Sequence, residues 1–259
     1  MTDVVLVERD GDIATVVFNR PEKLNAFTKG MWQRLGVVVE DLSLDTGLRC
    51  IVFRGAGDRA FSPGNDISEF ADERSNSEQA EAYGTLMNAA IEAMRGCTVP
   101  KVAMIHGVCV GGGLEIAGLC DIRICGESSR FGVPISKLGL VMGYQELGAL
   151  RDLVGPAGAL EILLEGRILD AAEALQKGIV SRIVADDTVE AEALATAQRI
   201  ADGAPLVHRW HRKFLDRLAD PTPLSDEEIK EAYVCYDTED FKAGYQAFLA
   251  KKKPDFEGR

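Results

Sequence analysis

Residues 108–124 read VCVGGGLEIAGLCDIRI, with three consecutive glycines between a short apolar run and a helical pattern. Glycine has no Cβ, so the backbone of Gly111–Gly113 can approach a ligand closely. The first amides of a helix have no partner inside the helix and carry partial positive charge, which favours a carbonyl oxygen or an anion there. The sequence therefore predicts that the N–H of Gly112 forms half of an oxyanion hole, with Glu115 beside it in the first helical turn.

A glycine-rich turn also has other uses. Phosphate binding is disfavoured, because the stretch contains neither GxGxxG nor the lysine that follows the glycines of a Walker motif. Close packing of a helix on a strand is an equal alternative on the glycines alone. An oxyanion hole needs a second N–H donor, and the stretch AFSPGNDI at residues 60–67 is the candidate for it.

The chain on either side of the glycines alternates strand patterns with helical ones. Short apolar runs at residues 50–53 and 102–105 predict buried strands, and residues 121–125 read as another strand. Asp10-Gly11 indicates a hairpin between residues 4–7 and 13–18. Helical spacing occupies 31–42 and 83–94, and the pattern is helical beyond about residue 185. Alternating strands and helices predict an α/β fold with a helical C-terminal part.

Composition disfavours several classes of protein. The 259 residues carry a formal net charge of −12, which repels a phosphate backbone and argues against nucleic acid as a partner. No run approaches the roughly 18 apolar residues of a membrane span. The six cysteines show no CxxC or Cys/His spacing, and the three histidines lack partners for a metal, so we expect none. The N-terminus has no signal-peptide pattern, which favours a reduced cytoplasmic location.

Six segments together resemble the crotonase (enoyl-CoA hydratase/isomerase) family. AFSPGNDISEF at residues 60–70 is similar to the family pattern AFxAGxDIxEM, and residues 108–124 are similar to GxxxGGGxELAxxCDxxI. Further blocks match in collinear order: NRPEKLNAF (19–27), FGVPISKLGL (131–140), GRILDAAEALQKGIVSRIV (166–184) and FLAKKKPDF (248–256). Several spaced motifs in one order are far more specific than any single one.

The resemblance implies a crotonase-like spiral of ββα units over residues 1–195 and a C-terminal helical trimerisation subdomain over 196–259. It implies a homo-trimer, or a hexamer made of two trimers. It also implies an acyl-CoA substrate. Because coenzyme A is then part of the substrate, no separate cofactor is expected.

The same resemblance implies which residues form the site. The thioester carbonyl is expected between the N–H groups of Asn65 and Gly112, where two fixed donors stabilise the charge of an enolate, and Glu115 is expected to act as general base or acid. The CoA moiety is expected along a turn at 24–26 and the loop at 60–67, with a C-terminal residue closing the pocket. The candidate CoA-binding residues are Lys23, Leu24, Ala26, Ala60, Gly64, Asp66, Ile67, Phe248 and Lys251.

One position departs from the family pattern. The family's hydratases add water with two glutamates; one matches Glu115, and the other should follow Pro134, where this chain has Ile135. Isoleucine cannot transfer a proton, and the family's isomerases use a glutamate at the same position. Either Glu115 acts alone, or Glu146 or Tyr144 has taken over the missing role, or the enzyme performs a different enolate reaction.

Each replacement candidate has a plainer interpretation. An acid near a helix start, like Glu146, commonly compensates the helix dipole, and Tyr144 is typical of a pocket wall. The leading hypothesis is an enoyl-CoA hydratase-like lyase of fatty acid metabolism that adds or removes water across the double bond of a 2-enoyl-CoA. The alternatives are an enoyl-CoA isomerase, an acyl-CoA decarboxylase or a thioester hydrolase on the same scaffold, or a catalytically silent CoA-binding protein.

Overall fold

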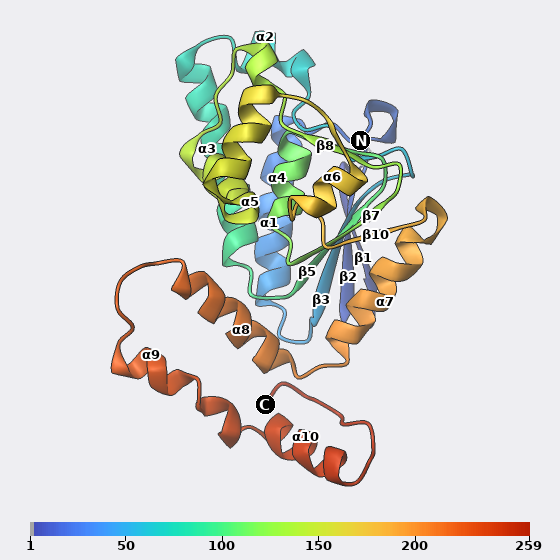
Figure 1. Cartoon of the computed structure of the whole chain (residues 1–259), viewed down its shortest axis with the longest axis vertical. Coiled ribbons are helices and arrows are strands. Elements are labelled where there is room, and N and C mark those ends of the chain that lie inside the picture. Colours follow the sequence, from blue (N-terminus) through green and yellow to red (C-terminus); the bar gives the residue numbers. More distant parts are fainter. Residues whose placement is uncertain (1–2) are drawn as a thin grey trace.

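The computed structural model describes residues 3–259, which form two sheets surrounded by helices and a helical arm at one end (Figure 1). The larger sheet follows the order β1-β2-β3-β5-β7-β10. Strands β1 and β2 pair as the predicted antiparallel hairpin, and the other neighbours are parallel. The strands are β1 Val5–Asp10, β2 Ile13–Phe18, β3 Cys50–Gly55, β5 Lys101–Ile105, β7 Ile122–Gly126 and β10 Arg182–Val184.

A smaller sheet follows the order β4-β6-β8-β9. Its strands are β4 Ala60–Ser62, β6 Val108–Val110, β8 Arg130–Gly132 and β9 Leu169–Asp170. The chain places one strand in each sheet in turn, β3 then β4, β5 then β6, β7 then β8, with a helix after each pair. This repetition confirms the predicted α/β spiral of ββα units.

Helices cover both faces of the larger sheet, because its central strands are apolar on both sides. On β3, Ile51 and Phe53 pack with α1 and α3, whereas Cys50 and Val52 pack with α7 on the opposite face. The helices are α1 Lys29–Leu44, α2 Phe70–Glu73, α3 Ser77–Gly96, α4 Gly112–Gly118, α5 Tyr144–Glu165, α6 Ala171–Gln176, α7 Val189–Ala201, α8 Pro205–Leu218, α9 Asp226–Glu231 and α10 Glu239–Leu249. Short 3-10 turns are η1 Pro21–Lys23, η2 Ile67–Glu69, η3 Ile135–Leu138, η4 Asp186–Thr188 and η5 Val234–Asp237.

The smaller sheet is the part of the fold that the sequence patterns do not predict. Residues 60–70 have the composition of a loop, yet Ala60–Ser62 form β4 and pair with β6. Strands of two or three residues are too short to show an alternation of apolar and polar side chains. They form here because partners distant in the sequence complete their hydrogen bonds.

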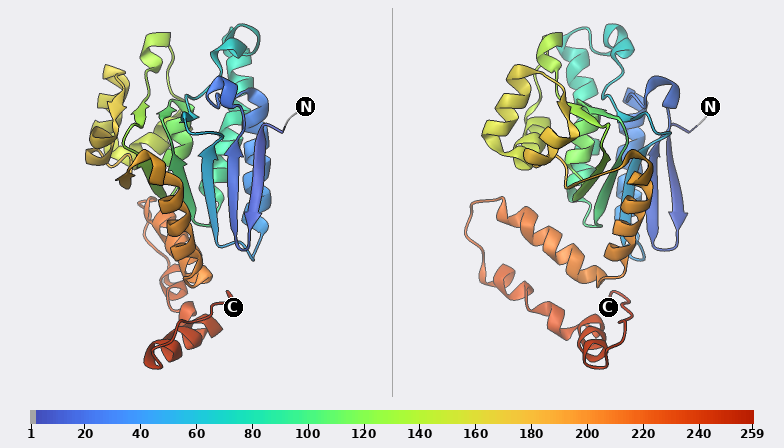
Figure 2. Two further views of the ribbon diagram at one scale, coloured as in Figure 1. Left: turned by 90° about the vertical axis from the view of Figure 1, so that its right-hand side faces the viewer. Right: turned by 45° about the vertical axis from the view of Figure 1, so that its right-hand side comes forward.

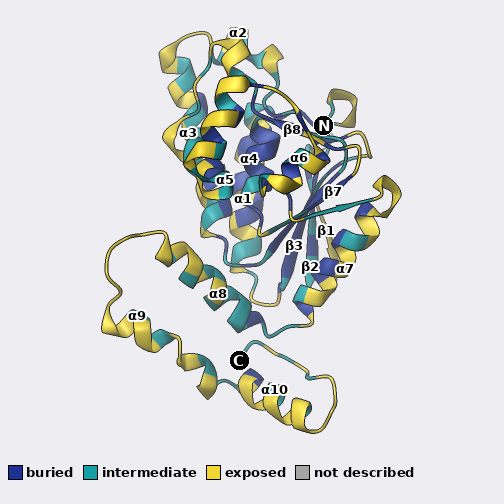
Figure 3. Ribbon diagram, in the orientation of Figure 1, coloured by how far each residue is buried: buried dark blue, intermediate teal, exposed yellow. Residues whose placement is uncertain are grey.

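The C-terminal arm, residues 205–259 with α8, α9 and α10, lies away from the sheets (Figure 2). Most of its residues are exposed (Figure 3). The predicted boundary between residues 195 and 196 falls inside α7, whose Val189, Ala193 and Ala197 pack on the larger sheet. The helices that leave the core thus begin at α8, and the division into two subdomains stays a prediction. Among the helices of residues 3–259, none has both the length and the apolar character to cross a membrane.

Candidate active site

The loop after β4 lies directly against the start of α4. A Cβ at Gly113 would lie 2.2 Å from the carbonyl oxygen of Ser62, and a Cβ at Gly64 would lie 2.8 Å from the nitrogen of Gly112. Gly64 also has a φ of +94°, which favours glycine. The glycines therefore do allow close packing, and this packing brings the Ala60–Ile67 loop to the helix N-terminus.

The backbone N–H groups of Asn65 and Gly112 lie where these segments meet. The N–H of Phe27 donates to the carbonyl of Gly64 and the N–H of Asp66 donates to the carbonyl of Phe27, both at 2.8 Å, so the N–H of Asn65 faces the other way. Within residues 3–259, neither the Asn65 nor the Gly112 N–H donates a hydrogen bond. Both residues line one cavity, as an oxyanion hole requires.

Trp32 on α1 holds both donor segments, and the sequence patterns do not identify it. Its indole Nε1–H donates to Oδ1 of Asn65 at 2.6 Å. A Cβ at Gly112 would lie 3.0 Å from the Cζ2 atom of Trp32. In the sequence, Trp32 reads only as a core position of an amphipathic helix, so its polar contact could not be foreseen.

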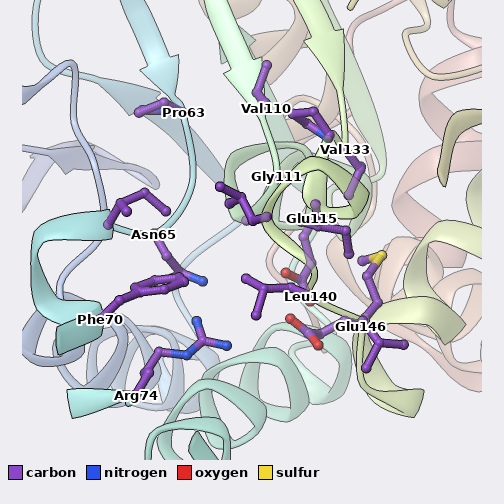
Figure 4. Close-up of a pocket in the computed structure, with 17 residues that line it drawn as sticks. Pro63, Asn65, Phe70, Arg74, Val110, Gly111, Glu115, Val133, Leu140 and Glu146 are labelled. Carbon is purple, nitrogen blue, oxygen red and sulfur yellow. The ribbon is translucent and has the colours of Figure 1, made fainter. Parts of the chain in front are cut away.

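The cavity has a volume of about 110 Å³ and brings together residues far apart in the sequence (Figure 4). Asn65 and Phe70 lie on one side of it, Gly111 and Glu115 lie together on the other side, and Glu146 comes from the start of α5. Its walls are largely apolar. The lining residues are Pro63, Asn65, Ile67, Phe70, Arg74, Val110, Gly111, Gly112, Glu115, Val133, Pro134, Ile135, Leu138, Leu140, Val141, Met142 and Glu146.

Glu115 and Glu146 form a pair of carboxyl groups beside the donors. Glu115 is only 7% exposed, and its Oε1 has no hydrogen-bond partner within residues 3–259. Burial raises the pKa of Glu115 well above its usual range, and the charge of Glu146 raises it further. Burial also raises the pKa of Glu146, whereas the N–H of Gly143, 2.5 Å from Oε2, and the charge of Arg74 lower it.

The second carboxyl group therefore comes from the start of α5. Ile135 forms part of the apolar wall, at the position where the resemblance leads one to expect glutamate. Tyr144, the other replacement candidate, is not among the described residues that line the cavity, and it is 92% exposed. The structure thus brings Glu146, and not Tyr144, to Glu115.

The two segments expected to hold CoA lie side by side. Leu24 and Asn25 adopt left-handed conformations, with φ of 53° and 64°. The Asn25 side chain donates to the carbonyl of Ala60 at 2.8 Å, which ties this turn to β4. Ala26 and Ala60 are buried, and Lys23 is exposed.

The Asp66 carboxylate pairs with Arg20 at 3.0 Å, so its side chain is already engaged within the fold. Ile67 is half-exposed and lines the cavity. Phe248 lies in α10 and Lys251 shortly after it, at the opposite end of the molecule from α2, whose Phe70 lines the cavity (Figure 1). A single chain does not bring these two residues to the site.

Comparison with known proteins gives one consistent result. The family model described as Enoyl-CoA hydratase/isomerase matches residues 8–259. A short-chain-enoyl-CoA hydratase of Clostridium acetobutylicum is 31% identical over 253 residues, 96% of this chain and 95% of that protein. A probable enoyl-CoA hydratase of Mycobacterium tuberculosis is 32% identical over 260 residues, 99% of either protein.

Solved structures agree. A crystal structure described as an enoyl-CoA hydratase/carnithine racemase from Magnetospirillum magneticum has a TM-score of 0.98 at 50% identity and covers 100% of this chain and 97% of its own. The crystal structure of an enoyl-CoA hydratase from Bacillus anthracis has a TM-score of 0.90 at 26% identity. This match covers 99% of the chain described here and 100% of the Bacillus chain.

The buried carboxyl of Glu115 should make stability depend on pH. Because its pKa is raised in the folded chain, the unfolded chain loses this proton first as the pH rises. We expect Glu115→Gln to increase the free energy of unfolding, by an amount that grows as the pH rises above the usual glutamate range and levels off above the folded-state pKa. Urea unfolding at a series of pH values measures it.

Glu173→Gln is the matched control. The Arg167 guanidinium lowers the pKa of this half-exposed carboxyl, so the loss of Glu173 should act in the opposite direction and only weakly. A Glu115→Gln gain that does not change with pH would contradict the raised pKa.

Proposed function

Because this chain belongs to the enoyl-CoA hydratase/isomerase family, we propose that it is a lyase that adds water to, or removes it from, the double bond of a 2-enoyl-CoA. One observation carries the proposal. The backbone N–H groups of Asn65 and Gly112, unpaired within residues 3–259, share a cavity with the buried carboxyl group of Glu115 and the half-buried one of Glu146. That combination suits a reaction in which a thioester carbonyl gains negative charge while protons move nearby.

The proposed chemistry passes through a thioester enolate. The carbonyl oxygen lies between the two N–H groups, and the helix dipole of α4 adds to their effect. When the oxygen of water bonds to the β-carbon, the electron pair of the double bond moves toward the carbonyl oxygen. Donors already fixed in place stabilise this charge without reorganisation, and each such donor contributes about 2.7–4 kcal/mol in comparable sites.

The carboxyl pair divides the proton transfers. Glu146 is the less buried of the two, and the N–H of Gly143 favours its ionised form, so we assign it as the base that takes a proton from water. Glu115 keeps its proton more strongly and delivers it to the α-carbon. A proton shift from Glu146 to Glu115 then restores the starting state. Dehydration follows the same steps in reverse.

The surroundings of the pair suit this division. Ile135 and the neighbouring apolar wall lower the polarity around the pair, which strengthens the electrostatic effect of both donors. The turn at Leu24 and the Ala60–Ile67 loop, joined through Asn25, are proposed to receive CoA. CoA enters as part of the substrate, so the proposal needs no further cofactor.

We also propose a homo-oligomer, a trimer or a hexamer. The C-terminal arm exposes large apolar side chains, among them Leu215 at 70%, Phe248 at 83% and Leu249 at 76%. Apolar surface of this extent is typical of a protein–protein interface. A subunit interface would also bring Phe248 and Lys251 to the CoA pocket of another copy, as a single chain does not.

A cytoplasmic enzyme of fatty acyl-CoA metabolism fits these features. The cysteines within residues 3–259 are free, and Cys50, Cys97, Cys109, Cys120 and Cys125 are buried. Unpaired cysteines are usual in a reducing compartment. The location itself is part of the proposal.

The hydratase proposal predicts loss of the conjugated enoyl thioester absorbance when the protein is incubated with crotonyl-CoA. Glu115→Gln should lower kcat by about 100- to 10,000-fold, the usual contribution of a positioned acid or base, while the Kd for a saturated acyl-CoA changes little. If the protein turns over a malonyl-type thioester but not crotonyl-CoA, its reaction is a decarboxylation and the hydratase proposal is wrong. Equal turnover of crotonyl-CoA by the unaltered protein and by Glu115→Gln would show that Glu115 does not take part in the reaction.

Placement of the two donors can be tested through Gly64. A methyl group at this position meets the Gly112 nitrogen, so we expect Gly64→Ala to lower kcat by roughly 100- to 1,000-fold. Gly57→Ala is the matched control, because Gly57 has a similar φ of +74° and a Cβ there meets nothing within 4 Å. If both variants lose activity equally, backbone strain alone explains the effect.

Oligomerisation predicts a sedimentation mass of three or six chains. Leu215→Glu puts a charge on the exposed apolar face of α8 and should shift the mass toward that of a single chain. Val7→Glu, on the edge strand β1, adds the same charge elsewhere and should leave the mass unchanged. A single-chain mass for the unaltered protein contradicts the proposed assembly.

A further inference from the structure

Arg74 is a positive charge in the wall of an otherwise largely apolar cavity. It follows directly after α2 and lines the cavity together with Phe70. Its guanidinium carbon lies 4.8 Å from the ring centroid of Phe70 and 4.9 Å from that of Tyr83. Two aromatic rings thus hold the group in place through cation–π contacts, which makes Arg74 a fixed feature of the wall.

The N–H donors of this guanidinium are available to a ligand. Among residues 3–259, no acceptor forms a hydrogen bond with the Arg74 side chain and no carboxylate forms an ion pair with it, although Arg74 is half-buried. Of the two acids in the cavity, Glu115 compensates it poorly, because burial raises the pKa of Glu115 and favours its neutral form. Glu146 attracts it at longer range but, within residues 3–259, forms no ion pair with it. An uncompensated guanidinium presents planar donors that match a carboxylate.

Arg74 lines the same cavity as the two proposed donor residues. Figure 4 shows Arg74 beyond Phe70 from Asn65, with its guanidinium directed toward Leu140 and Glu146. Asn65, Gly112, Glu115 and Arg74 line the same cavity, so an acyl chain whose thioester carbonyl lies at the Asn65 and Gly112 N–H groups can extend within it toward Arg74.

We propose that Arg74 binds a carboxylate at the end of the acyl chain, so that the preferred substrates are 2-enoyl-CoA thioesters of dicarboxylic acids. The inference rests on the proposed function, because it uses the thioester position assigned there. Phe70 and Tyr83 act as positioning residues for the guanidinium. The cavity then favours an acyl group that is apolar along its length and anionic at its end.

Binding gives a test that does not depend on turnover. Calorimetric titration compares glutaryl-CoA and adipyl-CoA, which end in a carboxylate, with butyryl-CoA, which does not. We expect the unaltered protein to bind at least one carboxylated thioester more tightly than butyryl-CoA. Arg74→Met should reduce that preference by roughly 10- to 100-fold, in line with a hydrogen bond to a charged group, and Arg74→Lys should keep part of it.

Arg34→Met is the matched control, because Arg34 is exposed on α1 and does not line the cavity. It should leave the preference intact. Turnover gives a second readout through the ratio of kcat/KM for glutaconyl-CoA to that for crotonyl-CoA, which Arg74→Met should lower by a similar factor. If Arg74 is only a counter-ion for Glu146, its loss changes kcat/KM by the same factor for glutaconyl-CoA and for crotonyl-CoA. The ratio then stays constant, and this result overturns the inference.

Failure of the inference and failure of the proposed function are distinguishable. Hydration of crotonyl-CoA without any preference for a carboxylated thioester overturns only the role of Arg74. A preference for glutaryl-CoA or adipyl-CoA that depends on Arg74, without hydration of either enoyl thioester, supports the anion site and overturns the hydratase. No binding of any acyl-CoA overturns both.

Discussion

The site depends on direct contact between two stretches of backbone, the loop after β4 and the first turn of α4. Any side chain larger than hydrogen at Gly64 or Gly113 would occupy space already filled by nitrogen or oxygen atoms of the other stretch. Because β4 and β6 are parallel neighbours in the smaller sheet, their pairing fixes this contact. The direction of the Asn65 and Gly112 amides is therefore set by the fold of the main chain.

Charge in the cavity is governed by what surrounds it. The apolar wall that includes Ile135 opposes ionisation of the Glu115 carboxyl, and a second acid beside it strengthens that effect. Glu146 keeps easier access to its ionised form through the N–H of Gly143. Arg74 adds a positive charge that aromatic rings, rather than an acid, hold in place. Two carboxyl groups of the same kind, those of Glu115 and Glu146, thus differ in how readily they ionise because their surroundings differ.

Much of the core could be predicted because its signals are local. The glycines and Glu115 lie within five consecutive residues, so a strand, a turn and a helix start suffice to place them. Glu146 is different, because its closeness to Glu115 depends on the path of the chain between β8 and α5. Tyr144, two residues earlier, points to solvent for the same reason. The sequence around Trp32 and Arg74 gives no sign that these residues belong to the site, since tryptophans in the core and arginines in polar loops are common.

The hydrogen bond from Trp32 to the Asn65 side chain has a practical consequence. An indole ring that lies against both donor segments is a natural chromophore directly beside the site. The chain contains two tryptophans, and the other, Trp210, belongs to α8 in the C-terminal arm. Replacing Trp210 by phenylalanine leaves a single emitter whose fluorescence reports occupancy of the pocket, without any label or any need to know which thioester the protein consumes.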